Sequence, residues 1–499
     1  MHKGAFGGVA SPVAPHKEAF WKRSFTGRSS QGGLQLTQAS PVEGLLRKSG
    51  IGAAVYRGGG DANPSPLLTK SGTNDKMVPI GRKAYKGFMK TQTVKGTNDY
   101  LPSETEIRDY LQSVILDTYK NAGFEHISTP ILEDAENLDK SDGGDNLNLI
   151  FKVLKRGDKL QRALEARDEK ALCDMGLRYD LTLPLCRYFA NNRPHLMTPF
   201  KAIQIDRVYR AERAQRGRLR EFVQCDIDII GSTAPECEIE LILTTARALQ
   251  KTGIGAFKIR INDRSLLRGA LSAVGFSEDV LDSVCITFDK LDKVGITGVC
   301  AELEEKGHSK ETIERFHAFF GGDAVTLDAV TRLVRDSSAA ERLQYIMDAV
   351  NTLSAGEVKT EFDISLVRGQ GYYTGTVFEV ASEEFSGAIG GGGRYDKLIG
   401  KFIGEDIPAV GFSIGFERIF SILKEKAGYV IPGGRKKVVV LYDRDSFIAA
   451  CKRADELRSE YDVTLCARGK KPGKQLSRFA ERGYNYFISE DLQKLQDLT

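Results

Sequence analysis

The sequence has 499 residues, of which 41% are apolar and 28% charged, the composition of a chain with a sizeable core rather than of a disordered one. The net charge is only +4, so a nucleic-acid surface would have to be a local patch. The eight cysteines form no Cys-x-x-Cys pair, which disfavours a zinc site and a disulfide framework, and no apolar run approaches the roughly 20 residues that span a membrane.

Residues 1–90 carry many more lysines and arginines than acidic residues, among frequent glycine, serine and proline. We expect a disordered basic N-terminal extension without a packed core. Three interpretations of it stay open. The first is a transit peptide, which would add a mitochondrial location to a cytoplasmic one. The second is a disordered arm that attracts RNA. The third is a start site placed too far upstream, with Met77 or Met89 as the true initiator.

The first regular structure is expected at Ser103. Ser103 and Glu106 have the spacing of a capping box, and apolar residues then recur at helical spacing as far as Gly123, which would end the helix. Phe124–Thr129 predicts a strand closed by Pro130, because a proline cannot donate to a β-ladder and belongs at a strand end or a sheet edge.

Two groups of strands are predicted by alternating, β-branched-rich runs at 196–231 and 358–420, and 264–355 has helical periodicity. This pattern indicates an α+β fold in which helices are inserted into an antiparallel-sheet domain. The core domain would span 91–425, with the helical insertion at about 264–355.

A second module is predicted after a Pro-Gly-Gly linker. Strands at Lys437–Tyr442 and Val463–Cys466 flank a helix at Ser446–Tyr461, which indicates an α/β domain over 434–499.

Residues 209–231 contain the densest chemical signal. Strand alternation after Gly217 places Phe222, Gln224, Asp226 and Asp228 on one face, with apolar residues on the other. A solvated sheet face would explain those polar residues equally well. The preceding segment favours a phosphate-binding site instead, because guanidinium groups bind phosphate oxygens bidentately. Its charged residues are Arg210, Glu212, Arg213, Arg216, Arg218 and Arg220.

Three further stretches are unusual. Residues 366–379 read Leu-Val-Arg-Gly-Gln-Gly-Tyr-Tyr-Thr-Gly-Thr-Val-Phe-Glu, 387–396 include four consecutive glycines, and 407–420 lead from a strand through glycines into a helix that carries Arg418. Consecutive glycines weaken a strand and are typical of a place where another group approaches the backbone closely.

The order and spacing of these stretches closely resemble those of histidyl-tRNA synthetases, and the resemblance covers about residues 94–499. The strand before Pro130 resembles motif 1 of the class II enzymes, 207–231 motif 2, and 407–420 motif 3. The stretches at 366–379 and 387–396 resemble the two motifs peculiar to histidyl enzymes. The resemblance implies a class II catalytic core, an anticodon-binding-like C-terminal domain, and a homodimer formed around motif 1.

The resemblance also implies an activity. Such an enzyme is a histidine–tRNA ligase: it activates L-histidine with ATP and Mg²⁺ to histidyl-adenylate and pyrophosphate, then esterifies the 3′ end of tRNA(His). Arg368 and Arg210 would be catalytic. The implied ATP ligands are Arg210, Glu212, Phe222 and Arg418, with Glu212 also on Mg²⁺. The implied histidine ligands are Asp180, Leu181, Thr182, Gln224, Asp228, Arg368, Tyr372 and Tyr373.

Two departures from the family pattern stand out. Gln370-Gly371 occupy the place of the usual Leu-Asp, and the C-terminal domain ends before the family's last strand and helix, so we expect it to be truncated. The alternative functions are a catalytically silent regulatory or histidine- or tRNA-sensing protein, and a class II synthetase for proline or threonine. The retained arginines and tyrosine pair argue against the first, and 366–379 against the second.

Overall fold

The computed structural model describes residues 89–141, 148–215, 217–322, 325–368, 371–426, 429–489 and 491–498. The predicted extension therefore lies outside the described residues except for its last two positions, and so do Arg216 and Gln370. No helix in these ranges is long and apolar enough to cross a lipid bilayer.

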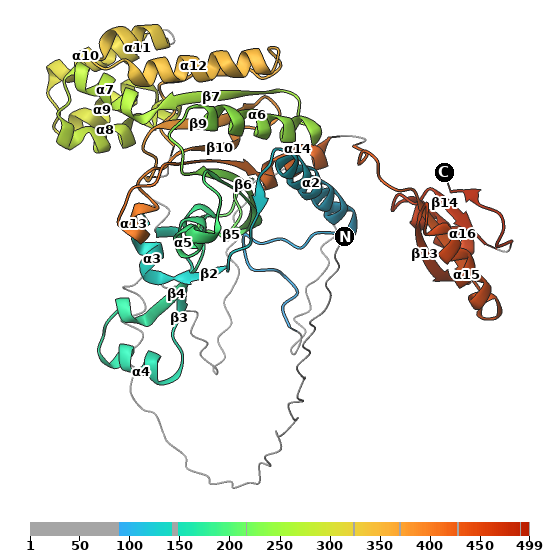
Figure 1. The fold of residues 1–499 in the computed structure, drawn as a ribbon. Coiled ribbons are helices and arrows are strands. Elements are labelled where there is room, and N and C mark those ends of the chain that lie inside the picture. Colours follow the sequence, from blue (N-terminus) through green and yellow to red (C-terminus); the bar gives the residue numbers. More distant parts are fainter. Residues whose placement is uncertain are drawn as a thin grey trace, which may run out of the picture. The chain divides into compact units, whose positions relative to one another are not determined.

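A large mixed sheet forms the centre of the core domain (Figure 1). Its strand order is β1-β5-β6-β11-β10-β9-β7-β8. The predicted antiparallel pairing holds in the centre, but β1 runs parallel to β5 and β7 parallel to β8. Helix-bearing segments join each of these pairs, and a long crossover permits parallel pairing. The strands are β1 Glu125–His126, β5 Phe200–Tyr209, β6 Glu221–Ile230, β7 Phe257–Asp263, β8 Thr360–Phe362, β9 Thr376–Ser382, β10 Ala388–Arg394 and β11 Ala409–Gly415.

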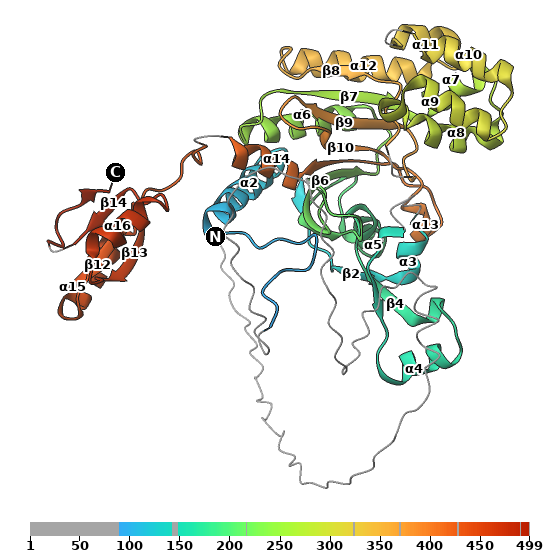
Figure 2. The ribbon, with the colours of Figure 1, turned by 180° about the vertical axis from the view of Figure 1, so that it is seen from behind.

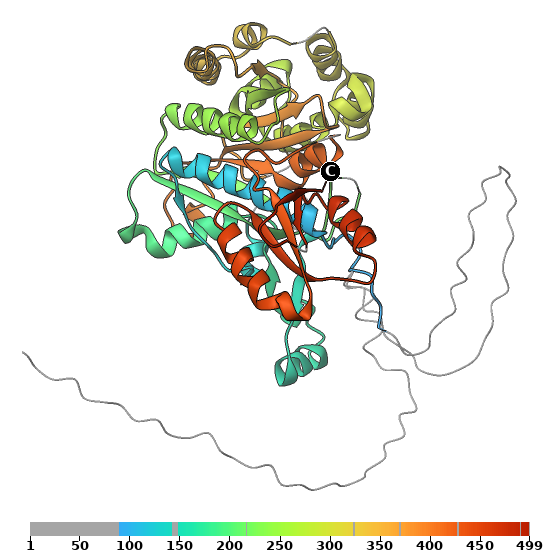
Figure 3. The ribbon, with the colours of Figure 1, turned by 90° about the vertical axis from the view of Figure 1, so that its right-hand side faces the viewer.

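One face of this sheet is covered by helices α2 (Pro102–Asn121), α6 (Glu236–Lys251) and α14 (Phe416–Glu425). Helices α2 and α6 lie side by side (Figure 3). Apolar side chains of all three helices join those of the strands in one core cluster. The predicted apolar face of β6 is confirmed, because Val223, Cys225, Ile227 and Ile229 all belong to this cluster.

Helix α2 begins one residue before the predicted start. Pro102 takes the first helical position, where a missing N–H is tolerated. The N–H of Leu101 donates to Oε2 of Glu104 at 2.7 Å, so the pairing of Ser103 with Glu106 in a capping box was wrong. The helix ends at Asn121, and Gly123 follows with a φ of +81°, in agreement with the predicted glycine stop.

The helical insertion is confirmed between β7 and β8, and Figure 2 shows its helices gathered beyond β7 at the edge of the sheet. An amphipathic pattern underlies it: α7, for instance, buries Leu266, Leu267 and Leu271. The helices are α7 Arg264–Val274, α8 Leu281–Phe288, α9 Leu291–Glu305, α10 Lys310–Phe320, α11 Leu327–Leu333 and α12 Ser338–Leu353.

A smaller three-stranded sheet of order β2-β4-β3 lies in the segment between β1 and β5. Its strands and the nearby short helices connect the segment around Pro130 to the second face of the large sheet, where Leu185 and Phe189 of α5 share a buried cluster with Phe200. The elements are β2 Leu132–Asp134, α3 Ala135–Asp139, β3 Lys152–Leu154, α4 Gly157–Glu165, β4 Cys173–Leu177 and α5 Thr182–Asn192, with α13 Gly400–Ile403 later in the chain.

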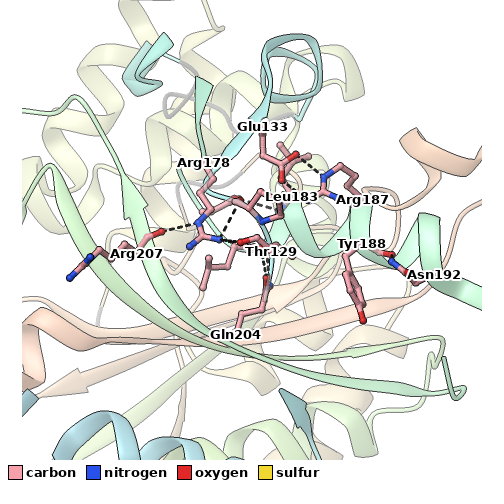
Figure 4. A network of polar contacts seen from close by, with 12 residues as sticks. Thr129, Glu133, Arg178, Leu183, Arg187, Tyr188, Asn192, Gln204 and Arg207 are labelled. Carbon is pink, nitrogen blue, oxygen red and sulfur yellow. Dashed lines mark hydrogen bonds and ion pairs between the residues drawn. The ribbon is translucent and has the colours of Figure 1, made fainter. Parts of the chain in front are cut away.

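A buried arginine ends the first strand early (Figure 4). Strand β1 covers only two of the six residues predicted at Phe124–Thr129. Arg178, with a fully buried side chain, donates from Nη1 to the carbonyl oxygen of Thr129 at 2.9 Å and from Nε to that of Arg207 at 2.8 Å. Because the Thr129 carbonyl bonds to a guanidinium rather than to a strand, the chain leaves the sheet there and is held close to the segment that carries Asp180.

The C-terminal module contains a four-stranded sheet of order β13-β12-β14-β15. The predicted strands are confirmed as β12 Lys437–Tyr442 and β13 Asp462–Ala467, with helix α15 (Phe447–Leu457) between them. Three further elements of the module were not predicted: α16 Pro472–Ala480, β14 Tyr486–Ile488 and β15 Gln496–Asp497. The module buries its own small core, which includes Val438, Val440 and Ile488.

Candidate active site

Polar side chains of β6 lie on the sheet face opposite the main core. Asp226 is opposite Ser413 of β11, and Ser413 is opposite Gly391 of β10. Asp228 is likewise opposite Gly411, which is opposite Gly393. Asp226 and Asp228 are 4% and 3% exposed, so the interpretation of this face as solvated is wrong here.

The glycines of β10 and β11 are required by the side chains above them. A Cβ atom on Gly411 would lie 1.9 Å from Oδ1 of Asp228, and one on Gly391 would lie 2.5 Å from Cζ of Arg368. A Cβ on Gly393 would meet Cδ1 of Tyr373 at 2.9 Å. Any larger residue would therefore displace a predicted site residue, which confirms the expectation that other groups approach this backbone closely.

Asp228 is held by a tyrosine that sequence analysis did not assign to the site. The hydroxyl of Tyr395 donates to Oδ1 of Asp228 at 2.7 Å. Burial raises the pKa of Asp228 to about 7, although the hydrogen bond from Tyr395 acts in the opposite direction. The signal for Tyr395 was present in the sequence, since it lies two residues after the glycine run.

The predicted segment 180–182 lies at the same face. The hydroxyl of Tyr372 is 3.3 Å from Oδ2 of Asp180 and 3.4 Å from Oγ1 of Thr182. Burial raises the pKa of Asp180 against the hydrogen bond that it accepts from the backbone of Leu183. The side chain of Leu181 is fully buried, and its carbonyl oxygen accepts from Nε2 of Gln204 at 2.8 Å.

Tyr373 stands beside this group. Its ring packs edge-on against that of Tyr372, with centroids 5.0 Å apart. Burial raises the pKa of Tyr373 to about 12, and the nearby Arg368 opposes this shift. The guanidinium of Arg264, the first residue of α7, donates to the carbonyl oxygens of Gly371 and Tyr373 at 3.2 and 3.0 Å. The helical insertion therefore holds the loop that carries the tyrosine pair.

Arg210 and Phe222 come together where β5 ends and β6 begins. The guanidinium carbon of Arg210 lies 5.2 Å from the centre of the Phe222 ring, and its Nε donates to the carbonyl oxygen of Tyr179 at 2.9 Å. Glu212 lies on the loop after Arg210, with Oε2 at 3.4 Å from Nη1 of Arg218. An aromatic face next to a guanidinium suits a base joined to a phosphate.

Arg368 has an unusual backbone for an arginine. Its φ is +66°, in the left-handed region that favours glycine, and such a conformation costs about 1 kcal/mol or more. Its Nη1 pairs with Oε2 of Glu379 at 3.1 Å. Glu379 was not among the predicted site residues, although it ends the same quoted stretch. The ion pair holds the guanidinium close to Gly391.

Arg418 completes a cluster of positive charge. It donates to the carbonyl oxygen of Ala388, and its guanidinium lies 5.8 Å from the ring centre of Phe385. Burial lowers the pKa of Arg418, and the neighbouring Arg368 and Arg218 lower it further. Mutually repelling buried guanidinium groups would be stabilised by a polyanion.

Comparison with known proteins identifies the family. The profile described as histidyl-tRNA synthetase matches residues 96–419. The histidine–tRNA ligase of Leifsonia xyli subsp. xyli is 40% identical to this chain, over 80% of this chain and 94% of the relative. The chain belongs to the histidyl-tRNA synthetase family. A second relative, the histidine–tRNA ligase of Christiangramia forsetii, is 34% identical over 81% of this chain and 92% of its own length.

Solved structures agree with this membership. The crystal structure of histidyl-tRNA synthetase from Nostoc sp. PCC 7120 matches with a TM-score of 0.67 at 29% identity, covering 81% of this chain and 93% of that one. A Bacillus halodurans protein, titled as an ATP phosphoribosyltransferase regulatory subunit/histidyl-tRNA synthetase, has a TM-score of 0.65 at 22% identity and shares the fold.

A magnesium site of the synthetase family can be tested against Glu212. No group of three or more metal-ligating side chains occurs among the described residues. Mg²⁺ at nucleotide sites commonly takes one or two carboxylates, with phosphate oxygens and water as the other ligands. Glu212, close to the arginine cluster, fits the role of one such ligand.

The sequence-predicted residues of the synthetase site thus fall into two groups on one sheet face. One group is rich in carboxyls and includes the tyrosine pair. The other is rich in arginines and lies around Phe222 and Gly391. The residues of the first group are Asp180, Thr182, Gln224, Asp228, Tyr372 and Tyr373, and those of the second are Arg210, Glu212, Phe222, Arg368 and Arg418.

We predict that Asp228→Asn stabilises the substrate-free protein more at about pH 8 than at about pH 5. The folded pKa of about 7 lies above the ordinary 3.8, so the folded state binds this proton more tightly than the unfolded state. The resulting stabilisation is complete below the unfolded pKa and is lost as the pH rises through 7. Asparagine avoids this loss, and its carbonyl can still accept from Tyr395.

Thermal melting of the variant and its parent across this pH range measures the effect. The difference in melting temperature is expected to widen by several degrees towards high pH. Asp117→Asn, which changes an exposed carboxylate on α2, serves as the matched control and should show no widening. A constant difference for Asp228→Asn would contradict the raised pKa.

Proposed function

We propose that this chain is a histidine–tRNA ligase, which activates L-histidine with ATP and esterifies the 3′ end of tRNA(His). The observation that carries the proposal is the approach of Arg368 and Asp228 to glycines of adjacent strands, on one buried polar face. The face thereby offers carboxyls to a cationic amino acid and guanidinium groups to a triphosphate.

Histidine would bind at the carboxyl-rich end. Its ammonium group would pair with Asp180, next to the hydroxyl groups of Thr182 and Tyr372. Asp228 and Tyr373 would contact the imidazole nitrogens, because a polar pocket rejects isosteres far better than an apolar one. Gln224 would contact the amino-acid backbone.

ATP would bind at the arginine-rich end. Phe222 would stack on adenine, with Arg210 on the α-phosphate and Arg418 on the distal phosphates. Mg²⁺, held by Glu212 and phosphate oxygens, would neutralise part of the negative charge on those phosphates. The lowered pKa of Arg418 supports this placement, since burial and the neighbouring Arg368 and Arg218 disfavour its charge and bound phosphates would favour it.

Two displacements complete the reaction. A carboxylate oxygen of histidine attacks the α-phosphorus, the bond to the bridging oxygen breaks, and pyrophosphate leaves. A ribose hydroxyl at the 3′ end of the tRNA then attacks the acyl carbon, its proton is released, and AMP leaves. Arg368 would stabilise charge on the α-phosphoryl group as the first attack proceeds.

A catalytically silent protein of the same fold is the competing function. The described site retains Arg210, Arg368 and Arg418 on the face that also holds Tyr372 and Tyr373, and the curated relatives over most of the chain are ligases. These observations favour catalysis.

Two segments outside the catalytic core, 1–90 and 434–499, also have proposed roles. We propose a cytoplasmic enzyme whose module at 434–499 contacts the anticodon, through basic residues such as Lys470, Lys471 and Lys474. The extension 1–90 keeps its three interpretations, a mitochondrial transit peptide among them.

Pyrophosphate exchange tests the function directly. With each of the standard amino acids in turn, we expect ATP–pyrophosphate exchange only with histidine. The control omits the amino acid. Exchange with another amino acid, or none with any, would contradict the proposal.

Arg368→Ala is expected to lower the exchange kcat by about 10²-fold or more, because charge builds on the α-phosphate only in the transition state. The KM values for ATP and histidine should change little. Arg368→Lys should rescue poorly, since an ammonium lacks the planar fork. Gly391→Ala should impair the same step, because its Cβ would displace the Arg368 guanidinium without removing its charge.

Thermal melting of these variants separates catalysis from folding. A collapsed kcat with an unchanged melt agrees with the catalytic role. A lowered melt with a normal kcat would show instead that Arg368 only braces the strand that follows it.

The homodimer is proposed at motif 1, in the region around Phe124–Pro130. Beside it, Ile131 and Leu132 are 39% and 48% exposed, and Met175 and Leu154 of the adjoining small sheet are 38% and 40% exposed. Apolar side chains gathered in this way are typical of a protein interface.

Sedimentation at micromolar concentration should give a dimer, and Leu132→Lys should shift it towards a monomer, because a charge would be buried in the interface. Leu353→Lys, at a leucine of α12 that is 63% exposed, is the matched control and should leave the dimer intact. An active monomer of the parent protein would rule the interface out.

A further inference from the structure

Asp226 is a buried carboxyl to which the proposed reaction gives no role. It is 4% exposed and lies on the same face of β6 as Gln224 and Asp228. The strand register places it between Gln204 of β5 and Ser413 of β11. Burial raises the pKa of Asp226 well above its ordinary value, and Asp228 raises it further. A carboxyl kept at such a cost needs a compensating contact.

Two contacts compensate for this cost: a hydrogen bond with Ser413, which opposes the rise in the pKa of Asp226, and a contact with Gln224. Nε2 of Gln224 lies 3.1 Å from Oγ of Ser413 and 3.5 Å from Oδ1 of Asp226. Both neighbours can accept, so the amide turns its N–H₂ group towards them. The reversed amide would place Oε1 against a carboxylate oxygen, and two acceptors repel. Asp226 and Ser413 therefore select one of the two amide orientations.

The selected orientation leaves an acceptor open. Oε1 of Gln224 is buried and has no hydrogen-bond partner among the described residues. A buried acceptor left without a donor destabilises the protein, so a ligand that supplies an N–H would recover this free energy. In histidine, the ammonium group offers three such donors, and Asp180 and Gln224 lie on the same sheet face.

We propose that Asp226 is a positioning residue: with Ser413, it holds the amide of Gln224 so that Oε1 faces the ammonium group of the substrate. The proposal rests on the proposed function, since it names the histidine site. Asp226 would not touch histidine itself. Its effect on substrate binding must then pass through Gln224, and this requirement can be tested.

A double-mutant cycle measures that dependence. Asp226→Asn keeps the shape of the side chain, but its own N–H₂ can donate to Oε1 and release the amide. We expect the KM for histidine to rise about tenfold in this variant, the loss of one hydrogen bond to a charged group. The KM for ATP and the melting temperature should stay near those of the parent. In a Gln224→Ala background, Asp226→Asn should change the histidine KM by less than about twofold.

Two further measurements sharpen the test. Ser413→Ala should raise the histidine KM in the same direction, though less, because it removes one of the two acceptors that fix the amide. 3-(Imidazol-4-yl)propionate, which lacks the ammonium group, should inhibit the parent and the Asp226→Asn variant equally. Asp117→Asn, at an exposed carboxylate on α2, is the control for the loss of one negative charge.

The outcomes are distinct. An equal effect of Asp226→Asn with and without Gln224 would overturn the proposal, because the carboxyl would then act on the substrate directly. So would an unchanged histidine KM, or a lowered melting temperature with parallel losses for ATP and histidine. Histidine-dependent exchange by the parent protein decides the proposed function first, so a failure there is not confused with a failure of the positioning role.

Discussion

Asp180, Asp226 and Asp228 are buried together on one face of the large sheet. Burying these carboxyls costs free energy, and the contacts in the rest of the site compensate for it. Burial raises the pKa of each carboxyl above its ordinary value. Tyrosine hydroxyl groups from distant segments compensate part of this cost. A bound cation would compensate more, which supports the proposal that this face binds an ammonium group and an imidazole.

Positively charged side chains lie at the other end of the same face. Arg210, Arg368 and Arg418 come from three separate stretches, and the first packs beside Phe222. The floor between the two ends is made of glycines, which let Arg368 and Asp228 settle close to the backbone. Under the proposed function, an amino acid and a triphosphate would be held here with their charges matched and their reacting atoms adjacent, and positioning of this kind supplies much of the rate in a transfer reaction.

Sequence reasoning was reliable for segments whose pattern reflects their own local structure. Alternation along β6 separated its apolar face from its polar face, and helical periodicity located the insertion at 264–355. It failed where a distant group took over a backbone atom. Nothing in the residues next to Arg178 predicts its partner, yet it donates to the Thr129 carbonyl and shortens β1. Glu104, rather than Glu106, caps α2 because Pro102 already occupies the first helical position.

The sequence by itself determined the family resemblance, the polar face of β6, and the need for glycine at 390–393, because each is written in neighbouring residues. Only the tertiary structure decided the partners of those residues. Tyr395 reaches Asp228 across 167 positions of the chain, and Arg264 holds the carbonyl of Gly371 across 107. The Gln224 amide acquires its orientation from Ser413, 189 positions away. These contacts follow from the register between strands that are remote in sequence, and no local pattern of residues specifies that register.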